Sequence, residues 1–378
     1  MQTRAANQDQ DTPRAAEVLA RTRAQVDPVL RAAVGTLPTR MRHIAGYHLG
    51  WWDVHGTPCH GGSGKALRPA LVLAAARATG ADGRAGRNRT GSNGTGPNGA
   101  GPTEAGLSGT EPHGAGLSAA AAVELVHNFT LLHDDVMDGD QLRRHRPTAW
   151  SAFGTPDAIL AGDALQALAL RLLARDAGRE AQAAGARLAW CVIELCEGQH
   201  ADCSFEERAD VGMAECLAMA EAKTGSLLGC ACALGALSAG ADEEVVDAMD
   251  AFGRCLGIAF QLIDDLLGIW GDPRVTGKPA GSDLTALKKS LPVVAALASG
   301  TEAGRELADV YASGTPLSDV QLPHVADLVE RAGGRAWAQG RADEFTRRAR
   351  DGLAEAVPDP DAAGELLSLA RLITRRDR

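Results

Sequence analysis

The stretch LLHDDVMDGDQLRRHRPT, residues 131–148, places four aspartates directly before three arginines and a histidine. An apolar run leads into it, so we expect a helix on which Asp134 and Asp138, four residues apart, share one face. Their repulsion would cost about 0.2–0.5 kcal/mol even without burial, so a positive partner is expected there. For this motif alone, a solvated acidic helix end explains the residues equally well.

A second acidic pair favours a cation site over a solvated acidic helix end. Asp264 and Asp265 lie in another apolar run, FQLIDDLLGIWGDP at residues 260–273. Carboxylates without neighbouring thiolates or imidazoles favour hard cations such as Mg²⁺, which binds through one or two carboxylates plus phosphate oxygens. Two apolar helices that each present aspartates therefore predict a metal cluster that holds a diphosphate at the mouth of a bundle cavity.

The remaining sequence predicts an all-α fold. Apolar residues recur at helical spacing in runs such as 156–175 and 243–270, and no alternating run of useful length indicates a β-strand. Several runs carry little charge, as expected for helices inside a bundle. We expect a single large helical bundle of about ten or more helices around a central apolar cavity.

The expected domain organisation has one folded unit. Residues 1–12 are polar and should form a disordered N-terminus, and residues 13–378 should form one domain. Residues 81–118 are rich in Gly, Asn, Ser and Thr, so they cannot bury enough apolar surface to offset their ordering entropy. We expect a flexible insertion there, and a segment that docks a partner is the less favoured alternative.

Composition narrows the classes of function. A net charge of −10 and a pI near 5.5 argue against nucleic-acid binding. The eight cysteines form no CxxC pair and most lie in Ala-, Leu- and Gly-rich runs, which indicates buried thiols in a reducing compartment. The longest apolar run, at 225–240, is short and rich in small residues, so no stable membrane insertion is expected. No signal peptide is recognised, and the sequence predicts a cytoplasmic protein.

Five ordered segments resemble the trans (E-type) isoprenyl diphosphate synthases of the polyprenyl synthetase family. They are GKALRP (64–69), ELVHNFTLLHDDVMDGDQLRRHRPT (124–148), AGDAL (161–165), KTG (223–225) and FQLIDDLLGIWGDPRVTGKPAGSDL (260–284), the last followed by KKSLP (288–292). The resemblance covers nearly the whole chain from about residue 30. It implies the isoprenoid synthase type I fold, a homodimer and a Mg²⁺-dependent prenyltransferase. Such an enzyme condenses isopentenyl diphosphate with dimethylallyl, geranyl or farnesyl diphosphate and releases diphosphate.

The resemblance implies that the allylic diphosphate is held by roughly three Mg²⁺ ions, because its departure separates diphosphate from an allylic carbocation. The metal ligands that it implies are Asp134, Asp135, Asp138, Asp264 and Asp265. Arg143, Lys223 and Lys278 would complete the clamp on this diphosphate. Thr224 and Gln261 would steady the cation and the diphosphate oxygens, with ordinary helix hydrogen bonding as the alternative for both.

Isopentenyl diphosphate stays intact, so it should be held without metal. Hydrogen bonds from cationic side chains bind phosphate without polarising its leaving oxygen as Mg²⁺ does. The resemblance implies a cradle made of Lys65, Arg68, His127 and Arg144. Seen alone, His127 would more often be a core histidine. Lys288 is also expected to bind substrate, although counting alone does not separate it from Lys289. Arg375 or Arg376 would either add a lid or belong to a frayed basic terminus.

Phe129 is the expected determinant of product length. It lies five positions before Asp134, next to the small Thr130, where it would form the floor of an apolar tunnel for the growing chain. An aromatic residue there, with no insertion in the first acidic motif, resembles synthases that stop at geranylgeranyl (C20) or farnesyl (C15) length. The resemblance narrowly favours C20.

The sequence departs from the family pattern at Gly268, where many relatives have a third aspartate. Asp272 is the replacement that the sequence offers, acting through water. His145 stands where glycine is common. Two alternatives stay open. A terpene cyclase of the same fold would have no use for the second diphosphate cradle, and a non-catalytic partner subunit would be expected to lose aspartates.

Overall fold

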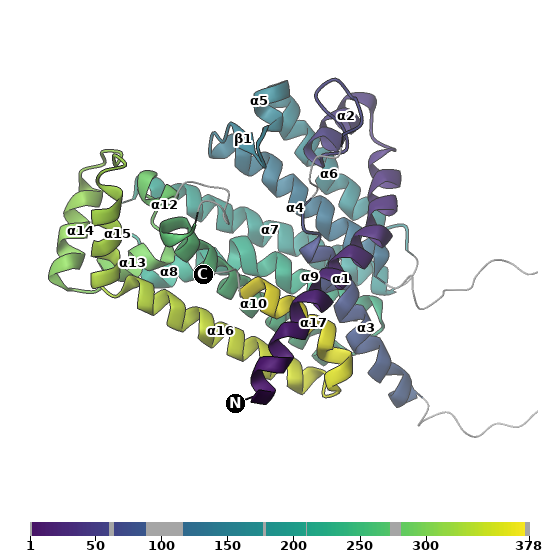
Figure 1. Ribbon diagram of the computed structural model, residues 1–378. Coiled ribbons are helices and arrows are strands. Elements are labelled where there is room, and N and C mark those ends of the chain that lie inside the picture. Colours follow the sequence, from purple (N-terminus) through teal and green to yellow (C-terminus); the bar gives the residue numbers. More distant parts are fainter. Residues whose placement is uncertain are drawn as a thin grey trace, which may run out of the picture.

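The computed structural model describes residues 2–59, 64–87, 116–176, 179–208, 210–272 and 281–374, and these form a helical bundle (Figure 1). The first part of the chain contains α1 (Gln2–Val34), α2 (Thr39–His48), α3 (Leu67–Arg87), α4 (Leu117–Met137), β1 (Leu142–Arg143), β2 (Arg146–Pro147), α5 (Ala149–Phe153), α6 (Thr155–Leu173) and α7 (Arg179–Glu207). The second part contains α8 (Met213–Ala220), the π-helix η1 (Glu221–Gly225), α9 (Ser226–Ser238), α10 (Glu243–Trp270), α12 (Ser282–Thr285), α13 (Leu291–Leu297), α14 (Glu302–Ala312), α15 (Leu322–Arg331), α16 (Gly334–Ala356) and α17 (Pro360–Thr374). The all-α fold expected from the sequence is confirmed.

Helix α9 lies at the centre of the bundle, in contact with α3, α4, α7 and α10. Each residue from Ser226 to Ala236 is buried, which explains why this run carries no charge. Around it, α4 packs on α6, and α10 packs on α16. The two helices that carry the acidic motifs, α4 and α10, are therefore both anchored in the same core.

Glycines let the helices around α9 approach one another closely. A Cβ atom at Gly235 would lie 2.2 Å from the backbone oxygen of Val72 in α3. A Cβ atom at Gly253 in α10 would lie 2.3 Å from the backbone oxygen of Leu228. Backbone atoms cannot move aside as the end of a side chain can, so only glycine fits at these two crossings.

A separate hydrophobic cluster joins the end of α10 to α12–α15. It includes Ile269 of α10, Leu284 of α12 and Leu328 of α15, all of them buried. In Figure 1 these shorter helices lie at the left of the molecule, beyond the end of α7. The cluster fixes α12 against the second acidic motif.

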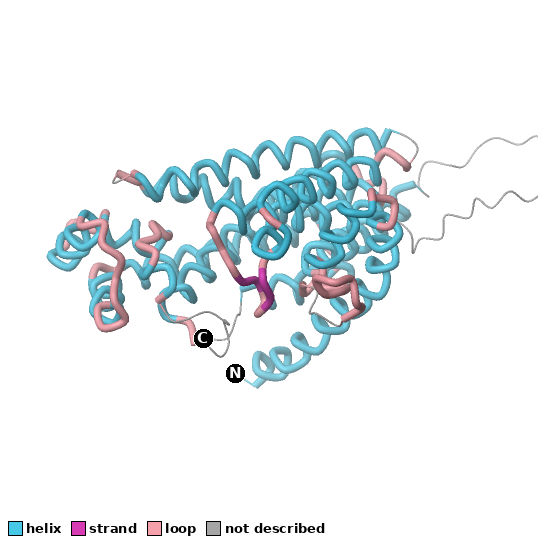
Figure 2. Tube along the Cα trace, turned by 90° about the horizontal axis from the view of Figure 1, so that it is seen from above, coloured by secondary structure: helices cyan, strands magenta, loops and turns pink. Residues whose placement is uncertain are grey.

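The strands β1 and β2 form a short antiparallel hairpin, with Arg143 opposite Arg146 (Figure 2). Its turn consists of Arg144 and His145, whose φ angles are 52° and 61°. Positive φ at both central residues is typical of the tight turns that suit a hairpin, and it favours glycine. The turn therefore explains why a glycine is common at position 145. Arg143 and Arg144 both belong to this hairpin, so their positions are fixed relative to each other.

The predicted segments at residues 1–12 and 81–118 stay predictions. Helix α1 is assigned from Gln2, α3 is assigned to Arg87 and α4 begins at Leu117. Residues 88–115 lie outside the described residues.

All eight cysteines are free thiols. Cys191, Cys216, Cys230 and Cys232 are buried as expected, whereas Cys196 is exposed. None of the helices in the described ranges combines the length and the apolar composition needed to cross a membrane.

Candidate functional site

The first acidic motif lies in the last turn of α4 and just beyond it. Asp138 follows the helix as its C-cap, and its backbone N–H donates to the Asp134 carbonyl at 2.8 Å. Burial raises the pKa of Asp134 to about 6, and the like charge of Asp138 adds to this although Lys223 opposes it. A buried carboxylate with a raised pKa would gain from a nearby divalent cation.

Asp135 is turned away from Asp134 and into the protein. It is 1% exposed, and Arg143 Nε donates to its Oδ1 at 2.7 Å. Its Oδ2 atom has no hydrogen-bond partner among the described residues. The structure therefore places Asp135 on the side of the arginine hairpin.

In the second acidic motif, too, the first aspartate is accessible and the second is buried. Asp264 is exposed, whereas Asp265 is 5% exposed and accepts hydrogen bonds from Gln261 Nε2 at 2.8 Å and the Leu291 backbone N–H at 2.9 Å. Thr224 Oγ1 donates to Gln261 Oε1 at 2.8 Å. Burial raises the pKa of Asp265 to about 7. Thr224, Gln261 and Asp265 thus form one hydrogen-bonded chain between η1 and α10.

Lys288 connects the two motifs. Burial works against its charge, but the carboxylates around it raise its pKa above the ordinary value. These carboxylates come from Asp138 of the first motif, Asp265 of the second, and Asp202 and Asp283. Lys289 points elsewhere, because its Nζ donates to the Phe205 carbonyl at 2.7 Å. The structure thus separates the two lysines, and carboxylates of both motifs favour the charge of Lys288, whose side chain is 41% exposed.

Asp202 of α7 is a site residue that the sequence analysis missed. Its Oδ2 lies 2.5 Å from Lys223 Nζ, and its Oδ1 lies 4.0 Å from Lys288 Nζ. Burial alone would raise the pKa of Asp202, but the two lysines outweigh it and the pKa falls below its ordinary value. Asp202 is one of several acidic residues in the 29-residue α7, and no local pattern sets it apart, since both of its partners come from later segments.

The π-helix η1 positions Lys223 and Thr224. Single π-helical turns are rare and often lie at functional sites. Here α7 passes very close to the widened turn, because a Cβ atom at Gly198 would lie 2.4 Å from the Lys223 backbone nitrogen. The close approach brings Asp202, one turn further along α7, to Lys223.

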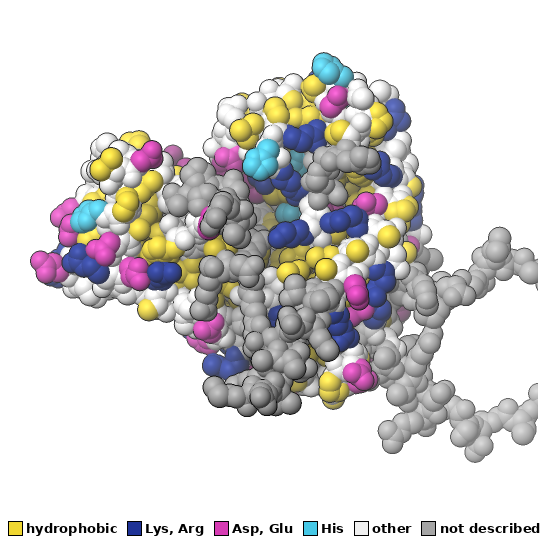
Figure 3. Space-filling view, in the orientation of Figure 1, with side chains coloured by type: hydrophobic (Ala, Val, Ile, Leu, Met, Phe, Trp, Pro, Cys, Tyr) yellow, Lys and Arg dark blue, Asp and Glu magenta, His cyan; other side chains and the backbone are white. Residues whose placement is uncertain are grey.

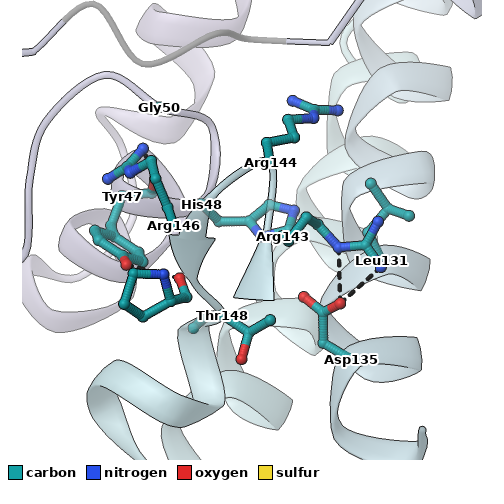
Figure 4. A pocket seen from close by; sticks show the side chains of 11 residues that line it. Tyr47, His48, Gly50, Leu131, Asp135, Arg143, Arg144, Arg146 and Thr148 are labelled. Atoms are coloured by element: carbon teal, nitrogen blue, oxygen red, sulfur yellow. Dashed lines mark hydrogen bonds and ion pairs between the residues drawn. The ribbon is translucent and has the colours of Figure 1, made fainter. Parts of the chain in front are cut away.

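A cationic pocket lies on the other side of Asp135 (Figure 4). Its lining includes Tyr47, His48, Gly50, Leu131, Asp135, Arg143, Arg144, Arg146 and Thr148. Arg146 lies over the Tyr47 ring, 4.5 Å from the centroid, and its Nη2 donates to the Trp52 carbonyl at 2.9 Å. Figure 3 shows Lys and Arg gathered on this face, around the position of β1 in Figure 1.

His48 is a second residue that the sequence analysis missed. Figure 4 shows its ring pointing from α2 towards Arg143. Burial, together with Arg143 and Arg144, lowers the pKa of His48 to about 3, although a hydrogen bond with Asn128 opposes this. His48 is the last residue of α2, a helix with no acidic motif, so its place among arginines could not be read from its neighbours in sequence.

The expected cradle is assembled in part. Arg68 Nη1 donates to His127 Nε2 at 3.1 Å. The pKa of His127 lies well below its usual range, mainly because the ring is buried and also because the positive charges of Arg68 and Arg144 are close. Arg144 approaches Gly64 so closely that a Cβ there would lie 2.8 Å from its Nη2. Lys65, the next residue, is exposed. The structure therefore brings the start of α3, the middle of α4 and the hairpin together.

Phe129 is 7% exposed and packs in the main core. Its ring meets the His133 ring edge-on, with 4.8 Å between the centroids. Thr130 Oγ1 donates to the His127 carbonyl at 2.8 Å. Lys278, Arg375 and Arg376 lie outside the described residues.

The carboxylate set fits hard divalent cations, because its donors are all oxygen and its buried members have raised pKa values. In the parts of the chain that the structure describes, no three His, Cys, Asp or Glu side chains are close enough to hold an ion unaided. Mg²⁺ commonly takes its remaining ligands from substrate phosphates and water. The site therefore suits an ion that arrives together with a diphosphate.

Comparison with known proteins agrees with this geometry. A model of the polyprenyl synthetase family matches residues 59–326. A geranylgeranyl diphosphate synthase from Mycobacterium tuberculosis is 45% identical over 95% of this chain and 93% of its own. A (2E,6E)-farnesyl diphosphate synthase from Mycobacterium bovis is 43% identical over 97% of this chain and 95% of its own. The crystal structure of a polyprenyl synthetase from Streptomyces coelicolor A3(2), 42% identical, superimposes with a TM-score of 0.82 and covers 94% of this chain and 98% of its own.

Proposed function

We propose a specific reaction for this chain, which belongs to the polyprenyl synthetase family and is a trans-prenyl diphosphate synthase. It condenses isopentenyl diphosphate with an allylic diphosphate, which is dimethylallyl, geranyl or farnesyl diphosphate. The allylic carbon–oxygen bond breaks, the double bond of isopentenyl diphosphate supplies the electrons of the new carbon–carbon bond, and diphosphate and a proton are released. The observation that carries this proposal is the convergence of both acidic motifs on Lys288, beside a separate cationic pocket.

The acidic side of the site would hold the allylic diphosphate. The polyprenyl synthetase family generally uses Mg²⁺, and we propose roughly three ions here, which would neutralise the developing charge on the leaving diphosphate. Asp134, Asp138 and Asp264 would hold them, whereas Asp135 and Asp265 are buried and accept hydrogen bonds inside the protein. Asp135 and Asp265 would instead hold Arg143 and Gln261 in position.

Lysines complete the binding of the leaving group. Lys223 and Lys288 are oriented by Asp202, so their ammonium groups already face the place where the diphosphate would lie. Arg143 stands between the two sides of the site through its ion pair with Asp135. We also propose Lys278 for this clamp, on the family resemblance alone.

The cationic side would hold isopentenyl diphosphate without metal. Arg68, Arg144 and Lys65 would donate to its phosphate oxygens, with His127 held by Arg68. Of these residues, Arg144 also lines the cationic pocket. The described lining of that pocket contains Arg143 and Arg146 and one carboxylate, Asp135, so an anionic diphosphate would be favoured there over a metal ion.

We propose that the product is all-trans geranylgeranyl diphosphate, narrowly ahead of farnesyl diphosphate. The relative with 45% identity is a geranylgeranyl diphosphate synthase and the one with 43% identity is a farnesyl diphosphate synthase. The choice between C20 and C15 therefore has to be argued from the residues that would line the product tunnel. The support is Phe129, a buried aromatic residue on α4 one to two turns before Asp134.

We propose that the protein is a cytoplasmic homodimer. Leu160 of α6 and Trp190 and Ile193 of α7 are more than half exposed, at 54%, 63% and 56%. Large apolar side chains exposed on two adjoining helices favour an interface between copies. The free thiols fit a reducing compartment. Light scattering after gel filtration would measure the mass of the assembly, and a monomer at micromolar concentration would contradict the dimer.

The reaction is tested by incubating purified protein with Mg²⁺, isopentenyl diphosphate and each allylic diphosphate in turn, and sizing the products by mass spectrometry. Elongation that requires isopentenyl diphosphate supports the proposal. A cyclic hydrocarbon formed without it would identify a terpene cyclase. Absence of any product with all three acceptors would indicate a non-catalytic subunit.

A further inference from the structure

The side chain of Arg254 in α10 reaches across to α7. Its Nη2 donates to Glu194 Oε2 of α7 at 2.8 Å, and its Nε donates to Asp250 Oδ2 at 2.6 Å. Its Nη1 lies 3.8 Å from Oε1 of Glu221, the first residue of η1. One guanidinium group therefore faces α7, α10 and η1 at once, although none of these residues belongs to either acidic motif.

The π-helix η1 lies between α7 and α10, which both pack on it. On one side, a Cβ atom at Gly198 of α7 would lie 2.4 Å from the Lys223 backbone nitrogen. On the other side, a Cβ atom at Gly257 of α10 would lie 2.5 Å from the Cα atom of Gly225. The backbone of α7 thus rests on Lys223 and that of α10 on Gly225. The place of Lys223 therefore depends on the separation at which α7 and α10 are held.

One face of α7 carries the contacts that set this separation. Glu194, Gly198 and Asp202 are four residues apart and so share a helix face. Glu194 pairs with Arg254, Gly198 rests on the Lys223 backbone, and Asp202 pairs with the Lys223 ammonium group. A change at Glu194 would therefore shift the same face that orients Lys223.

We propose that the ion pair between Arg254 and Glu194 holds α7 and α10 at a fixed separation around η1, and that Arg254 is thereby a positioning residue for the Lys223 ammonium group. This inference rests on the proposed function, in which Lys223 binds the allylic diphosphate. Arg254 would act only through Lys223 and would not touch the substrate.

The ion pair is sheltered enough to have this effect. The Arg254 and Glu194 side chains are 25% and 24% exposed, so water screens their attraction less than that of a surface pair. Burial works against the charge of Arg254, but hydrogen bonds to Glu194 and Asp250 outweigh it and raise the pKa of Arg254 above its ordinary value. The contact with Glu221 is longer and more exposed, so Glu194 has the larger part.

A second ion pair between α7 and α10 provides a matched control. Arg187 Nη2 donates to Asp247 Oδ1 at 2.9 Å, and its Nη1 lies 3.5 Å from Asp250 Oδ1. Arg187 precedes Gly198 by about three helical turns, so it joins the two helices away from η1. If Arg254 only stabilised the packing of these helices, replacing Arg187 should have the same consequences.

The test measures the affinity for inorganic pyrophosphate in Mg²⁺ by titration calorimetry, with isopentenyl diphosphate added first to fill the cationic side. Pyrophosphate represents the leaving group, so no turnover is needed. We expect Arg254→Gln and Glu194→Gln each to weaken its binding by about 10-fold, because a displaced lysine loses a charge-assisted hydrogen bond. Arg187→Gln should bind pyrophosphate as the wild type does, and all three variants should bind isopentenyl diphosphate normally.

A double-mutant comparison shows whether Arg254 acts through Lys223. In a Lys223→Met background, Arg254→Gln should change the pyrophosphate affinity by less than about twofold, because the group that it positions is already absent. A second 10-fold loss in that background would overturn the inference. Unchanged affinity in both Arg254→Gln and Glu194→Gln, or an equal loss in Arg187→Gln, would also overturn it. If Arg254→Gln fails to fold, as judged by circular dichroism, Glu194→Gln decides in its place, alone and with Lys223→Met.

The proposed function is judged separately in the same preparation. Wild-type protein that makes no prenyl diphosphate would refute the reaction, while the pyrophosphate affinities would still decide whether Arg254 positions Lys223. Active wild-type protein, together with undiminished pyrophosphate binding in Arg254→Gln and Glu194→Gln, would refute this inference alone.

Discussion

Asp202 of α7 and Lys223 of η1 form an ion pair, with 2.5 Å between Oδ2 and Nζ, at the place where the two acidic motifs converge. The same carboxylate faces Lys288 at 4.0 Å. One aspartate that belongs to neither motif therefore orients two lysines towards the proposed leaving group.

We expect Asp202→Asn to destabilise the metal-free protein by about 1–3 kcal/mol, because both lysines lose their main countercharge in a partly buried site. The Lys223 and Asp202 side chains are 24% and 15% exposed, so solvent screens the pair only in part. Urea denaturation measures the change. Asp247→Asn, which removes an exposed partner of Arg187, should cost no more than about 1 kcal/mol. Equal effects of the two changes would show that Asp202 is an ordinary surface residue.

The partly buried His48 gives a pH dependence of stability whose sign can be stated. Its pKa is about 3 in the folded protein and about 6.5 when unfolded, so the unfolded chain takes up a proton first as the pH falls. The stability that neutral His48 contributes is fully present above pH 6.5 and is lost below it. Between pH 7.5 and pH 5 we expect a loss of roughly 2 kcal/mol from this group.

This loss should be smaller in His48→Asn, which cannot take up the proton. The measurement is the free energy of unfolding of both proteins from pH 8 to pH 5, and the difference between them isolates His48. His55→Asn, at an exposed position, is the control and should follow the wild type. A wild type and a His48→Asn variant with parallel pH profiles would contradict a His48 that is neutral in the folded protein at pH 5.

Phe129→Ala should lengthen the product, because it removes the aromatic ring proposed as the floor of the tunnel. The change also opens a core cavity and should cost about 3–5 kcal/mol of stability. Phe345→Ala on α16 is a matched control, since Phe345 has the same 7% exposure but packs in a different cluster. Mass spectrometry of the products should show longer chains for Phe129→Ala only. The same chain length in all three proteins would remove Phe129 from this role.

Gly235 should tolerate no side chain. Gly235→Ala would place its Cβ 2.2 Å from the Val72 backbone oxygen, so α9 and α3 would have to separate, at a cost of about 1–3 kcal/mol. Gly340→Ala in α16 meets nothing within 4 Å and should stabilise the protein by about 0.5–1 kcal/mol. Thermal unfolding of both variants tests this packing, and a Gly235→Ala protein as stable as the wild type would contradict it.

Much of the fold could be predicted because its signals are local. The uncharged run of α9 and the helical spacing in α10 indicate buried helices without knowledge of their partners. The end of α3 and the start of α4 were harder to predict from the sequence. Residues 81–87 and 117–118 share the Gly-rich or small-residue composition of the segment between them, although their backbone is helical. Composition describes a segment as a whole, whereas a helix end depends on a few residues.

The site was predictable where charge breaks an apolar pattern. Asp134, Asp138 and Asp264 stand out for that reason, and Arg143 and Arg144 follow them directly. Asp202 and His48 could not be found in this way, because each acts on residues from another element and nothing beside it in sequence records that contact. The sequence also could not separate aspartates that face the site from those tied inwards, such as Asp135 and Asp265.

The central claim is that one protein holds two diphosphates by different means, one with divalent ions and one without. Titration calorimetry tests it most directly, with isopentenyl diphosphate and an unreactive thiolo analogue of geranyl diphosphate each added in Mg²⁺ and in EDTA. We expect isopentenyl diphosphate to bind with similar affinity in both solutions, and the allylic analogue to bind only in Mg²⁺. An allylic analogue that binds equally well in EDTA, or isopentenyl diphosphate that requires Mg²⁺, would contradict the account.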